Sequence, residues 1–181
     1  MASALFGGID PVVGPLQRPS CVLSPCGRYR YELRIPLSSS GTVVLFILAN
    51  PSTAVVTDGV FKSDRTITKC INYAKRWGMG TLLVGNVRAW RETNPELVPP
   101  DPEAIGDEND AYLKRLADEA HMVIGGWGKL GGDRGLAAAR LLREAGKPLY
   151  ALKRNGDGSP AHPLYLAARL TPQLVTEAHR G

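Results

Sequence analysis

The feature that most constrains the fold is an unbroken run of seven apolar residues, Val43–Ala49, followed at once by the polar segment Asn50–Thr53. A short run rich in Val, Leu and Ile is typical of a strand that is buried on both faces. In an open α/β sheet, ligands bind just beyond the carboxyl ends of the strands. The pattern therefore predicts a central strand whose polar end borders a binding site.

The same pattern recurs three times, and helical periodicity lies between the runs. Apolar runs that end in polar or glycine residues occupy Thr81–Asn86, Met122–Gly126 and Pro148–Leu152. Helical spacing of apolar residues covers Arg65–Trp77, Asp107–Glu119 and Leu136–Ala145. Alternating strands and helices predict a parallel sheet with helices on both faces. We expect an α/β fold, a three-layer α/β/α sandwich with a central, mostly parallel four-stranded sheet.

The segments around this core carry weaker patterns. Arg28–Pro36 alternates apolar and charged residues, which predicts a half-buried antiparallel edge strand that forms a hairpin with Val43–Ala49. Residues 1–27 are rich in Gly, Pro and Ser and are expected to form an irregular arm before a single domain over residues 28–181. Thr53–Asp64 is predicted to be a loop whose end caps the next helix, and Leu174–His179 a short final helix.

Composition sets loose bounds on function. The chain has 181 residues, 44% of them hydrophobic and 22% charged, as in an ordinary soluble domain. A net charge of +5 and a pI near 9.3 permit a phosphate-bearing partner without requiring one. Three cysteines suggest a reducing compartment and no zinc set, and neither a signal peptide nor a membrane span is visible. We expect a cytoplasmic protein without a metal or other cofactor, and the oligomeric state stays open.

The end of the first core strand carries the strongest candidate residues. The Asn50 side chain offers both a donor and an acceptor and could orient a nucleophilic water. Asp58 and Asp64 follow and could serve as a general base or as electrostatic stabilisers. The alternative is that Asn50 and Ser52 only cap the next element and that both aspartates are surface charges.

The other strand ends add residues suited to a phosphate and a base. Arg88 and Arg91 follow the second strand, where arginines could contact phosphates. A glycine-rich turn follows the third strand, but it matches neither the GxGxxG nor the P-loop spacing, and it could equally be a tight turn around a packed tryptophan. His162, after the fourth strand, could donate a hydrogen bond to a developing anion. Phe61 could stack on a base or enter the core.

Several unusual segments occur in an order that resembles a known family. The segments RYRYEL, LANPSTA, DRTITKC, CINYAKRWG, GWGKLG and HPLYL together resemble a conserved bacterial and phage family of unknown function, from about Arg28 to Leu166. One loop departs from the family pattern, because Asn94 stands where an acidic residue is usual.

The layout also resembles the uracil-DNA glycosylase superfamily, particularly its mismatch-specific thymine/uracil branch. That resemblance implies that an NPG-type motif positions the water, that an asparagine reads the base edge and that a His-Pro motif stabilises the departing base. Asn50-Pro51, Asn86 and His162-Pro163 match these three positions, and Phe61 falls where a stacking aromatic residue is expected. Ser52 departs from the glycine of that branch.

The function expected from these residues is metal-independent hydrolysis of an N-glycosidic bond in DNA. The catalytic residues would be Asn50, Asp58, Asp64 and His162. The substrate-binding residues would be Ser52, Thr53, Phe61, Asn86, Arg88, Arg91, Trp127, Gly128 and Lys129. Two alternatives remain open: an N-glycosidase of nucleosides or nucleotides, and a non-catalytic nucleic-acid-binding phage accessory protein.

Overall fold

The computed structural model describes residues 18–52, 54–57 and 60–176. The strands are β1 (Ser20–Leu23), β2 (Arg30–Pro36), β3 (Val43–Leu48), β4 (Val55–Thr57), β5 (Val60–Lys62), β6 (Thr81–Asn86), β7 (Met122–Gly125), β8 (Leu149–Ala151) and β9 (Gln173–Leu174). The α-helices are α1 (Arg65–Arg76), α2 (Asn109–Glu119) and α3 (Gly132–Glu144). The short 3-10 helices are η1 (Pro95–Leu97), η2 (Lys129–Gly131) and η3 (Pro163–Tyr165).

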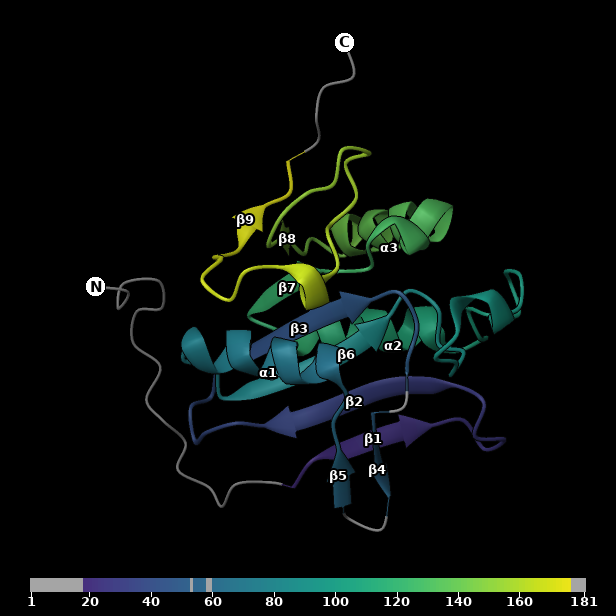
Figure 1. The fold of residues 1–181 in the computed structure, drawn as a ribbon, viewed down its shortest axis with the longest axis horizontal. Coiled ribbons are helices and arrows are strands. Elements are labelled where there is room, and N and C mark those ends of the chain that lie inside the picture. Colours follow the sequence, from purple (N-terminus) through teal and green to yellow (C-terminus); the bar gives the residue numbers. More distant parts are fainter. Residues whose placement is uncertain (1–17, 53, 58–59, 177–181) are drawn as a thin grey trace.

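One mixed sheet organises the molecule, with strand order β1-β2-β6-β3-β7-β8-β9 (Figure 1). The four strands β6, β3, β7 and β8 are parallel, as the alternation of strands and helices predicted. The predicted four-stranded description is too narrow, because β2 and β1 extend the sheet antiparallel at one side and β9 does so at the other. The α/β class is therefore confirmed, with a sheet of seven strands among the described residues.

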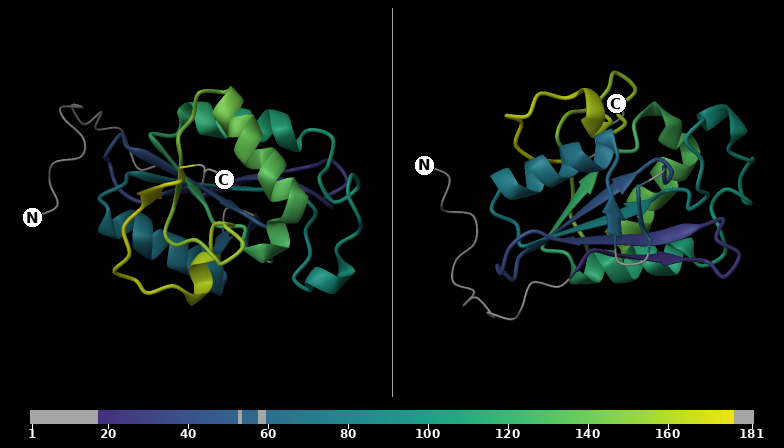
Figure 2. Two further views of the ribbon diagram at one scale, coloured as in Figure 1. Left: turned by 90° about the horizontal axis from the view of Figure 1, so that it is seen from above. Right: turned by 60° about the horizontal axis from the view of Figure 1, so that its bottom comes forward.

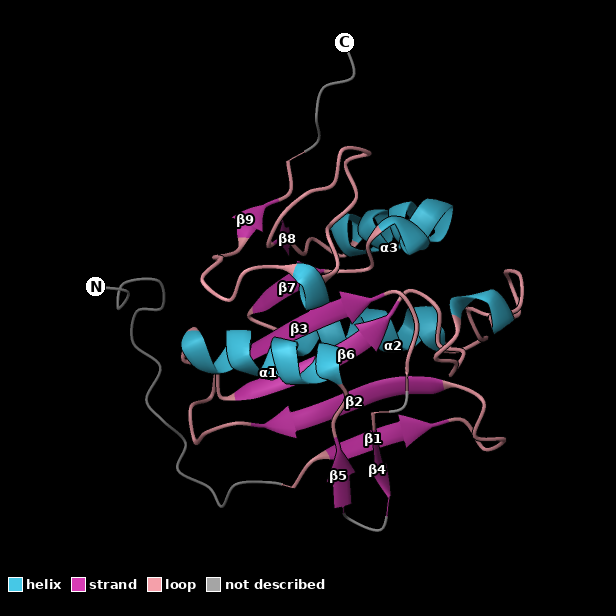
Figure 3. Ribbon diagram, in the orientation of Figure 1, coloured by secondary structure: helices cyan, strands magenta, loops and turns pink. Residues whose placement is uncertain are grey.

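Helices cover both faces of this sheet (Figures 2 and 3). Helix α1 buries Ile67, Cys70 and Tyr73 against the side chains of Val44 and Phe46 on β3. Helices α2 and α3 pack on the opposite face, which is lined by the alternate residues of the same strand. Because strand side chains alternate between faces, each residue at a strand end belongs to either the α1 face or the α2/α3 face.

The pairing of β2 differs from the prediction. Strand β2 pairs antiparallel with β6 rather than with β3, and β1 covers its other side, so β2 is not an edge strand. The amides of Leu37 and Ser38 both donate to the carbonyl of Gly80, immediately before β6. Alternation in a sequence indicates which residues share a face, but it does not identify the neighbouring strand.

A bulge in the same strand reverses the expected exposure of its charges. Leu23 pairs with Arg30 and Val22 with Glu32, so Tyr31 is an extra residue in β2. Arg30 consequently lies on the α1 face, whereas Glu32 lies on the other face and binds Arg34 and Arg115 at 2.9 and 2.7 Å. Arg30 and Glu32 are only 1% and 4% exposed, although the alternation predicted that both would face solvent.

Three terminal or connecting segments also differ from expectation. The predicted loop Thr53–Asp64 contains the β4–β5 hairpin, which lies beside β1 and outside the large sheet (Figure 1). The arm expected over residues 1–27 includes strand β1. Leu174 belongs to β9 rather than to a helix, and residues 177–181 lie outside the described part. Across the described ranges, no helix combines the length and apolar character needed to cross a membrane.

Candidate functional site

A buried guanidinium and a buried amide meet at the carboxyl end of β6. Arg30 donates from Nη2 to Oδ1 of Asn86 at 3.2 Å and from Nη1 to the carbonyl of Ala54 at 2.6 Å. The guanidinium can only donate, so it fixes which end of the Asn86 amide is oxygen. Nδ2 of Asn86 and Nε of Arg30 are then buried donors with no partner among the described residues. Because an unpaired buried donor is costly, both call for an acceptor from a ligand or an ordered water.

The backbone beside Asn86 is held from the opposite face of the sheet. Asn109, at the start of α2, donates from Nδ2 to the carbonyls of Asn86 and Val87 at 2.9 and 3.2 Å. Arg134 of α3 donates from Nε to the carbonyl of Val87 at 2.7 Å. Both side chains are buried. The amide of Asn86 therefore projects from a strand end that two helices hold in place.

Asp64 connects the end of β3 to helix α1. Its Oδ1 accepts from the backbone N–H of Ile67 at 2.8 Å and so caps α1, as predicted. Its Oδ2 accepts from the hydroxyl of Ser52. Burial lowers the pKa of Arg30 to about 10, and the negative charge of Asp64 partly offsets that shift. A carboxylate and an unpaired buried cation therefore lie close together on the α1 face.

His162 joins this centre from the chain after β8. Its Nδ1 accepts from the backbone N–H of Leu164 at 3.4 Å, which caps the short helix η3 beside α1. Burial lowers the pKa of His162, and the charge of Asp64 partly opposes the shift. A neutral imidazole that accepts at Nδ1 carries its proton on Nε2. The residue is thus prepared to donate a hydrogen bond at neutral pH.

The glycines after β7 make room for the segment that carries His162. A Cβ on Gly126 would lie 3.0 Å from Cδ of Pro163, and one on Gly128 would lie 3.4 Å from Cβ of His162. The N–H of Gly128 donates to the carbonyl of Pro160 at 2.9 Å, with φ of +63°. The glycine-rich turn therefore packs against the segment of Pro160, His162 and Pro163 and not, at these positions, against a ligand.

This polar centre lies within the part of the chain that a known family covers. A family model described as "Protein of unknown function (DUF1643)" matches residues 30–164. The chain belongs to this family. The matched range begins at Arg30 and extends past His162, so the DUF1643 region contains every residue of the centre described above.

Other comparisons found no relatives. Neither the curated proteins nor the solved structures gave a match to this chain. The predicted membership of a family of unknown function is thus confirmed, whereas the resemblance to uracil-DNA glycosylases gains no support. Any function of this DUF1643 chain must be argued from its own residues.

Asn50 has its amide hydrogens engaged by the backbone. Nδ2 donates to the carbonyl of Glu92 at 2.6 Å and to that of Pro51 at 3.3 Å. The N–H of Glu92 returns a hydrogen bond to the carbonyl of Pro51 at 3.0 Å. In this arrangement Asn50 fixes the loop after β6 against the loop after β3, which is a positioning role.

Other predicted site residues lie away from the centre. Trp127 is buried on the α2/α3 face, where its indole packs against Gly131 and Gly135. Arg88 forms a two-pronged ion pair with Asp101 at 2.8 Å and donates to the carbonyl of Leu130.

The remaining predicted substrate contacts divide between the core, the surface and the undescribed residues. Phe61 is partly buried against the core on the α1 face, and Lys129 is exposed beside the large groove described below. Thr53 and Asp58 lie outside the described residues.

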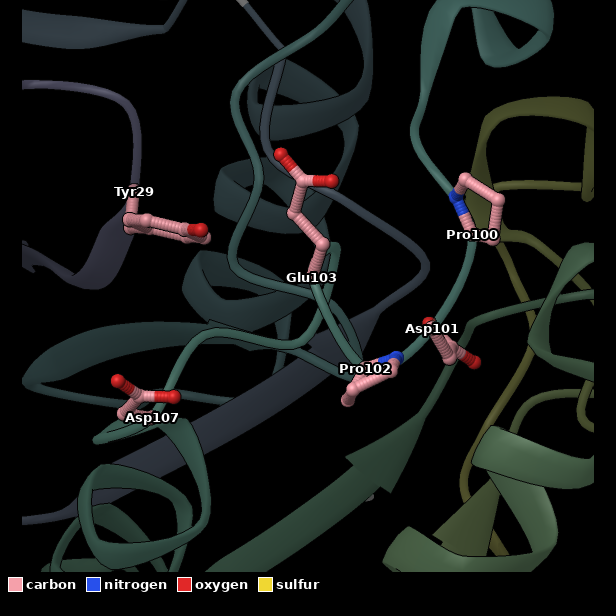
Figure 4. Close-up of a pocket in the computed structure, with 6 residues that line it drawn as sticks. All are labelled: Tyr29, Pro100, Asp101, Pro102, Glu103 and Asp107. Carbon is pink, nitrogen blue, oxygen red and sulfur yellow. The ribbon is translucent and has the colours of Figure 1, made fainter.

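Three of the cavities in the described part of the molecule bear on the site. A groove of about 1040 Å³ runs between α3 and β9, and its rim includes Lys129, Lys147 and Arg154. An acidic hollow of about 380 Å³ lies between Tyr29 and the carboxylates of Glu103 and Asp107 (Figure 4).

The third cavity is a cleft of about 240 Å³ just beyond β3, and its lining includes Ser52 and Arg91. The linings of these three cavities do not include Asn50, Asn86 or His162. No three His, Cys, Asp or Glu side chains of the described ranges are grouped to hold a metal ion.

Sequence reasoning missed Arg30 as a site residue. The alternation in β2 assigned it to the solvent face, and no residue in the sequence marks the bulge at Tyr31. Arg28 was also not predicted as a site residue, although it lines the small cleft with Arg91. The clustering of arginines in RYRYELR was the one available signal.

Proposed function

We propose that this protein hydrolyses the N-glycosidic bond of a nucleobase in DNA or in a nucleotide. The observation that carries the proposal is the pair of unpartnered buried donors, Arg30 Nε and Asn86 Nδ2, next to the Ser52–Asp64 pair and His162. Donors of this kind suit the carbonyl oxygens of a base and the negative charge that the base acquires as it leaves. The order of motifs that resembles uracil-DNA glycosylases suggested the same reaction.

The proposed reaction adds one water across the bond between the sugar C1′ and the base nitrogen. As that bond breaks, its electron pair moves to the base, and the water oxygen bonds to C1′. The carboxylate of Asp64 takes a proton from the water and later releases it to solvent, and the anionic base takes a proton from solvent, so that the products are a free base and a sugar hydroxyl. Each oxygen of Asp64 retains a lone pair beyond its present hydrogen bond, so the carboxylate can still accept a hydrogen bond from that water.

The other residues act by hydrogen bonding and charge. The amide of Asn86 donates to a base carbonyl, and Arg30 holds that amide while adding positive charge near the leaving base. His162 donates from Nε2 to the same anion as it develops. The Nδ2 group of Asn50 holds the surrounding loops, its Oδ1 could still orient the water as the sequence predicted, and we assign the general-base role to Asp64.

Substitution of Asp64 by Asn separates catalysis from capping. Asn keeps the cap of α1 but cannot accept from Ser52 through its nitrogen and removes the negative charge beside Arg30, so Asp64→Asn should lower the free energy of unfolding by about 1–3 kcal/mol while the protein still folds. Loss of a general base should lower the rate of base release by about 100-fold or more. Chromatography of free bases, after incubation with a panel of nucleotides and base-modified oligonucleotides, measures that rate.

Asp133→Asn is a matched control, because Asp133 is an exposed carboxylate in the first turn of another helix, α3. The control should release base at the wild-type rate. Base release by the Asp64→Asn protein at the wild-type rate would contradict the assignment of the general base. Absence of release by the wild type from every substrate would contradict the proposed reaction.

A binding role without catalysis is the second candidate. The groove of about 1040 Å³ beside α3 has Lys129, Lys147 and Arg154 at its rim, a charge pattern that suits phosphates. Salt-sensitive binding of an oligonucleotide that weakens on Lys129→Met, with no base released, would favour this role. In that case the polar centre on the α1 face would serve folding alone.

A further inference from the structure

The cleft beyond β3 has walls that are held by hydrogen bonds on each side. Its lining includes Arg28, Ser52, Trp90, Arg91 and Glu92, and its volume is about 240 Å³. The N–H of Arg91 donates to the carbonyl of Arg28 at 2.9 Å, and Nη1 of Arg91 donates to the carbonyl of Gly27 at 2.8 Å. The Asn50–Glu92 contact fixes the third side. The cleft is therefore preorganised without a ligand.

The charge of the side chains that line this cleft is positive on balance, with two arginines against the single carboxylate of Glu92. Arg28 and Arg91 form no ion pair within the described ranges, and Nε of Arg91 is a buried donor without a partner. The carboxylate of Glu92 is directed to the backbone N–H groups of Thr93 and Asn94, at 2.8 and 2.9 Å. Arg91 also lies close enough to the buried Arg30 for its charge to act on that guanidinium. Gathered arginines with free donors form a site for an anion that accepts several hydrogen bonds.

The cleft is adjacent to the proposed reaction centre. Ser52 lines the cleft and donates its hydroxyl to Asp64, so a single side chain separates the two sites. Trp90 adds an aromatic ring to the cleft wall, with its ring at 84° to that of Tyr29. A nucleotide whose phosphate occupies the cleft would therefore have the Asp64 carboxylate one side chain away.

The surroundings favour a small anion over a nucleic acid strand. The acidic hollow next to Tyr29 contains Glu103 and Asp107, whose carboxylates would repel further phosphates along a strand (Figure 4). Arg88, which could otherwise contact such a strand, is paired with Asp101. A cleft of 240 Å³ accommodates a phosphate and part of a sugar, but it is smaller than the sites that enclose larger ligands.

We infer that the cleft of Arg28 and Arg91 binds the phosphate monoester of a free nucleotide, which makes a nucleoside monophosphate the substrate of the proposed reaction. The inference rests on the proposed function for the identity of the reaction, but phosphate binding itself can be tested without turnover. Arg28→Met is the first variant, because Arg28 donates no side-chain hydrogen bond that the fold depends on within the described ranges. Arg91→Met is the second variant, and Arg140→Met, an exposed arginine on α3, is the matched control.

Calorimetric titration should compare inorganic phosphate, nucleoside monophosphates, the parent nucleosides and a single-stranded oligonucleotide. We expect wild type and Arg140→Met to bind a monophosphate about 10-fold or more tightly than its nucleoside, and Arg28→Met and Arg91→Met to lose that preference. Equal binding of monophosphate and nucleoside by the wild type would overturn the inference. Tighter binding of the oligonucleotide than of any monophosphate, abolished by Arg28→Met, would also overturn it.

The two proposals fail in different ways. Phosphate-dependent binding that Arg28→Met removes, without release of any base, supports the phosphate site and contradicts the reaction. Base release that proceeds equally from nucleosides and monophosphates, and equally in Arg28→Met, supports the reaction and contradicts the phosphate site.

Discussion

At the residue scale, the side chains at the polar centre have both a structural and a chemical use. Asp64 caps α1, His162 caps η3 and Asn50 joins two loops, so their presence alone is explained by folding. The free donors of Arg30 and Asn86 are different, because folding leaves them unpaired. A buried arginine that has no ion-pair partner within the described part of the chain is costly, which favours a role beyond stability.

The buried His162 makes the stability of the protein depend on pH. Its pKa is lowered in the folded protein by burial, so the unfolded chain binds the proton more readily. The stability that this residue contributes is complete above its unfolded pKa and is lost as pH falls through the lower, folded pKa. Between pH 7.5 and 5, the wild type should therefore lose stability relative to His162→Asn, which can still cap η3 but cannot titrate.

Urea unfolding of both proteins at several pH values measures this difference. His121→Asn is the matched control, since His121 is an exposed histidine whose Nδ1 accepts from the N–H of Val43. If the free energies of unfolding of the wild type and of His162→Asn differ by the same amount at every pH in this range, His162 does not titrate as a buried group.

At the element scale, the turn between β7 and α3 is organised by packing around Trp127. Cβ atoms added to Gly131 and Gly135 would lie 2.1 and 2.5 Å from atoms of the indole, closer than any real contact. Gly131 before α3 and Gly135 within it therefore let the start of this helix approach the ring of Trp127, which follows β7. Trp127 contributes to the core of the α2/α3 face, and this explains the motif without a ligand.

Gly135→Ala tests that packing. In an open helix the change would stabilise by up to about 1 kcal/mol, because alanine has the higher helix propensity. Here the added methyl group meets a buried ring, so we expect a loss of about 1–3 kcal/mol in urea unfolding. Gly156→Ala is the control, since no atom lies within 4 Å of its added Cβ, and it should change stability by less than about 0.5 kcal/mol. A Gly135→Ala protein more stable than the wild type would show that the indole moves aside.

At the scale of the whole molecule, local patterns predicted the parallel core but not its borders. Buried strands such as β3 and β6, and helix α1 with its Asp64 cap, follow from apolar runs, helical spacing and capping residues. The positions of β1, β2 and β9 in the sheet depend on long-range pairing between strands. The alternation of apolar and polar residues does not indicate which strands pair.

The same limit applies to the residues of the candidate site. Ser52, Asp64, Asn86 and His162 were singled out because they follow predicted strands, and in the structure they lie in one region of the α1 face; their role as site residues stays a prediction. Arg30 could not be predicted, because a single bulge decides which face it occupies. Trp127 and Arg88 were predicted to bind substrate because of their residue types. Trp127 instead packs on the α2/α3 face, and Arg88 pairs with Asp101.

The central claim is that Arg30 and Asn86 present free donors to a nucleotide at the carboxyl edge of the sheet. Nitrogen-15 NMR of the side-chain Nε–H of Arg30 and Nδ2–H₂ of Asn86, assigned with Arg30→Lys and Asn86→Asp, observes these groups directly. On titration with nucleoside monophosphates, we predict that both signals shift in proportion to occupancy, while the Nδ2–H₂ signals of Asn109, which is hydrogen-bonded to the backbone, stay in place. If a monophosphate binds and neither signal moves, the account of this site is contradicted.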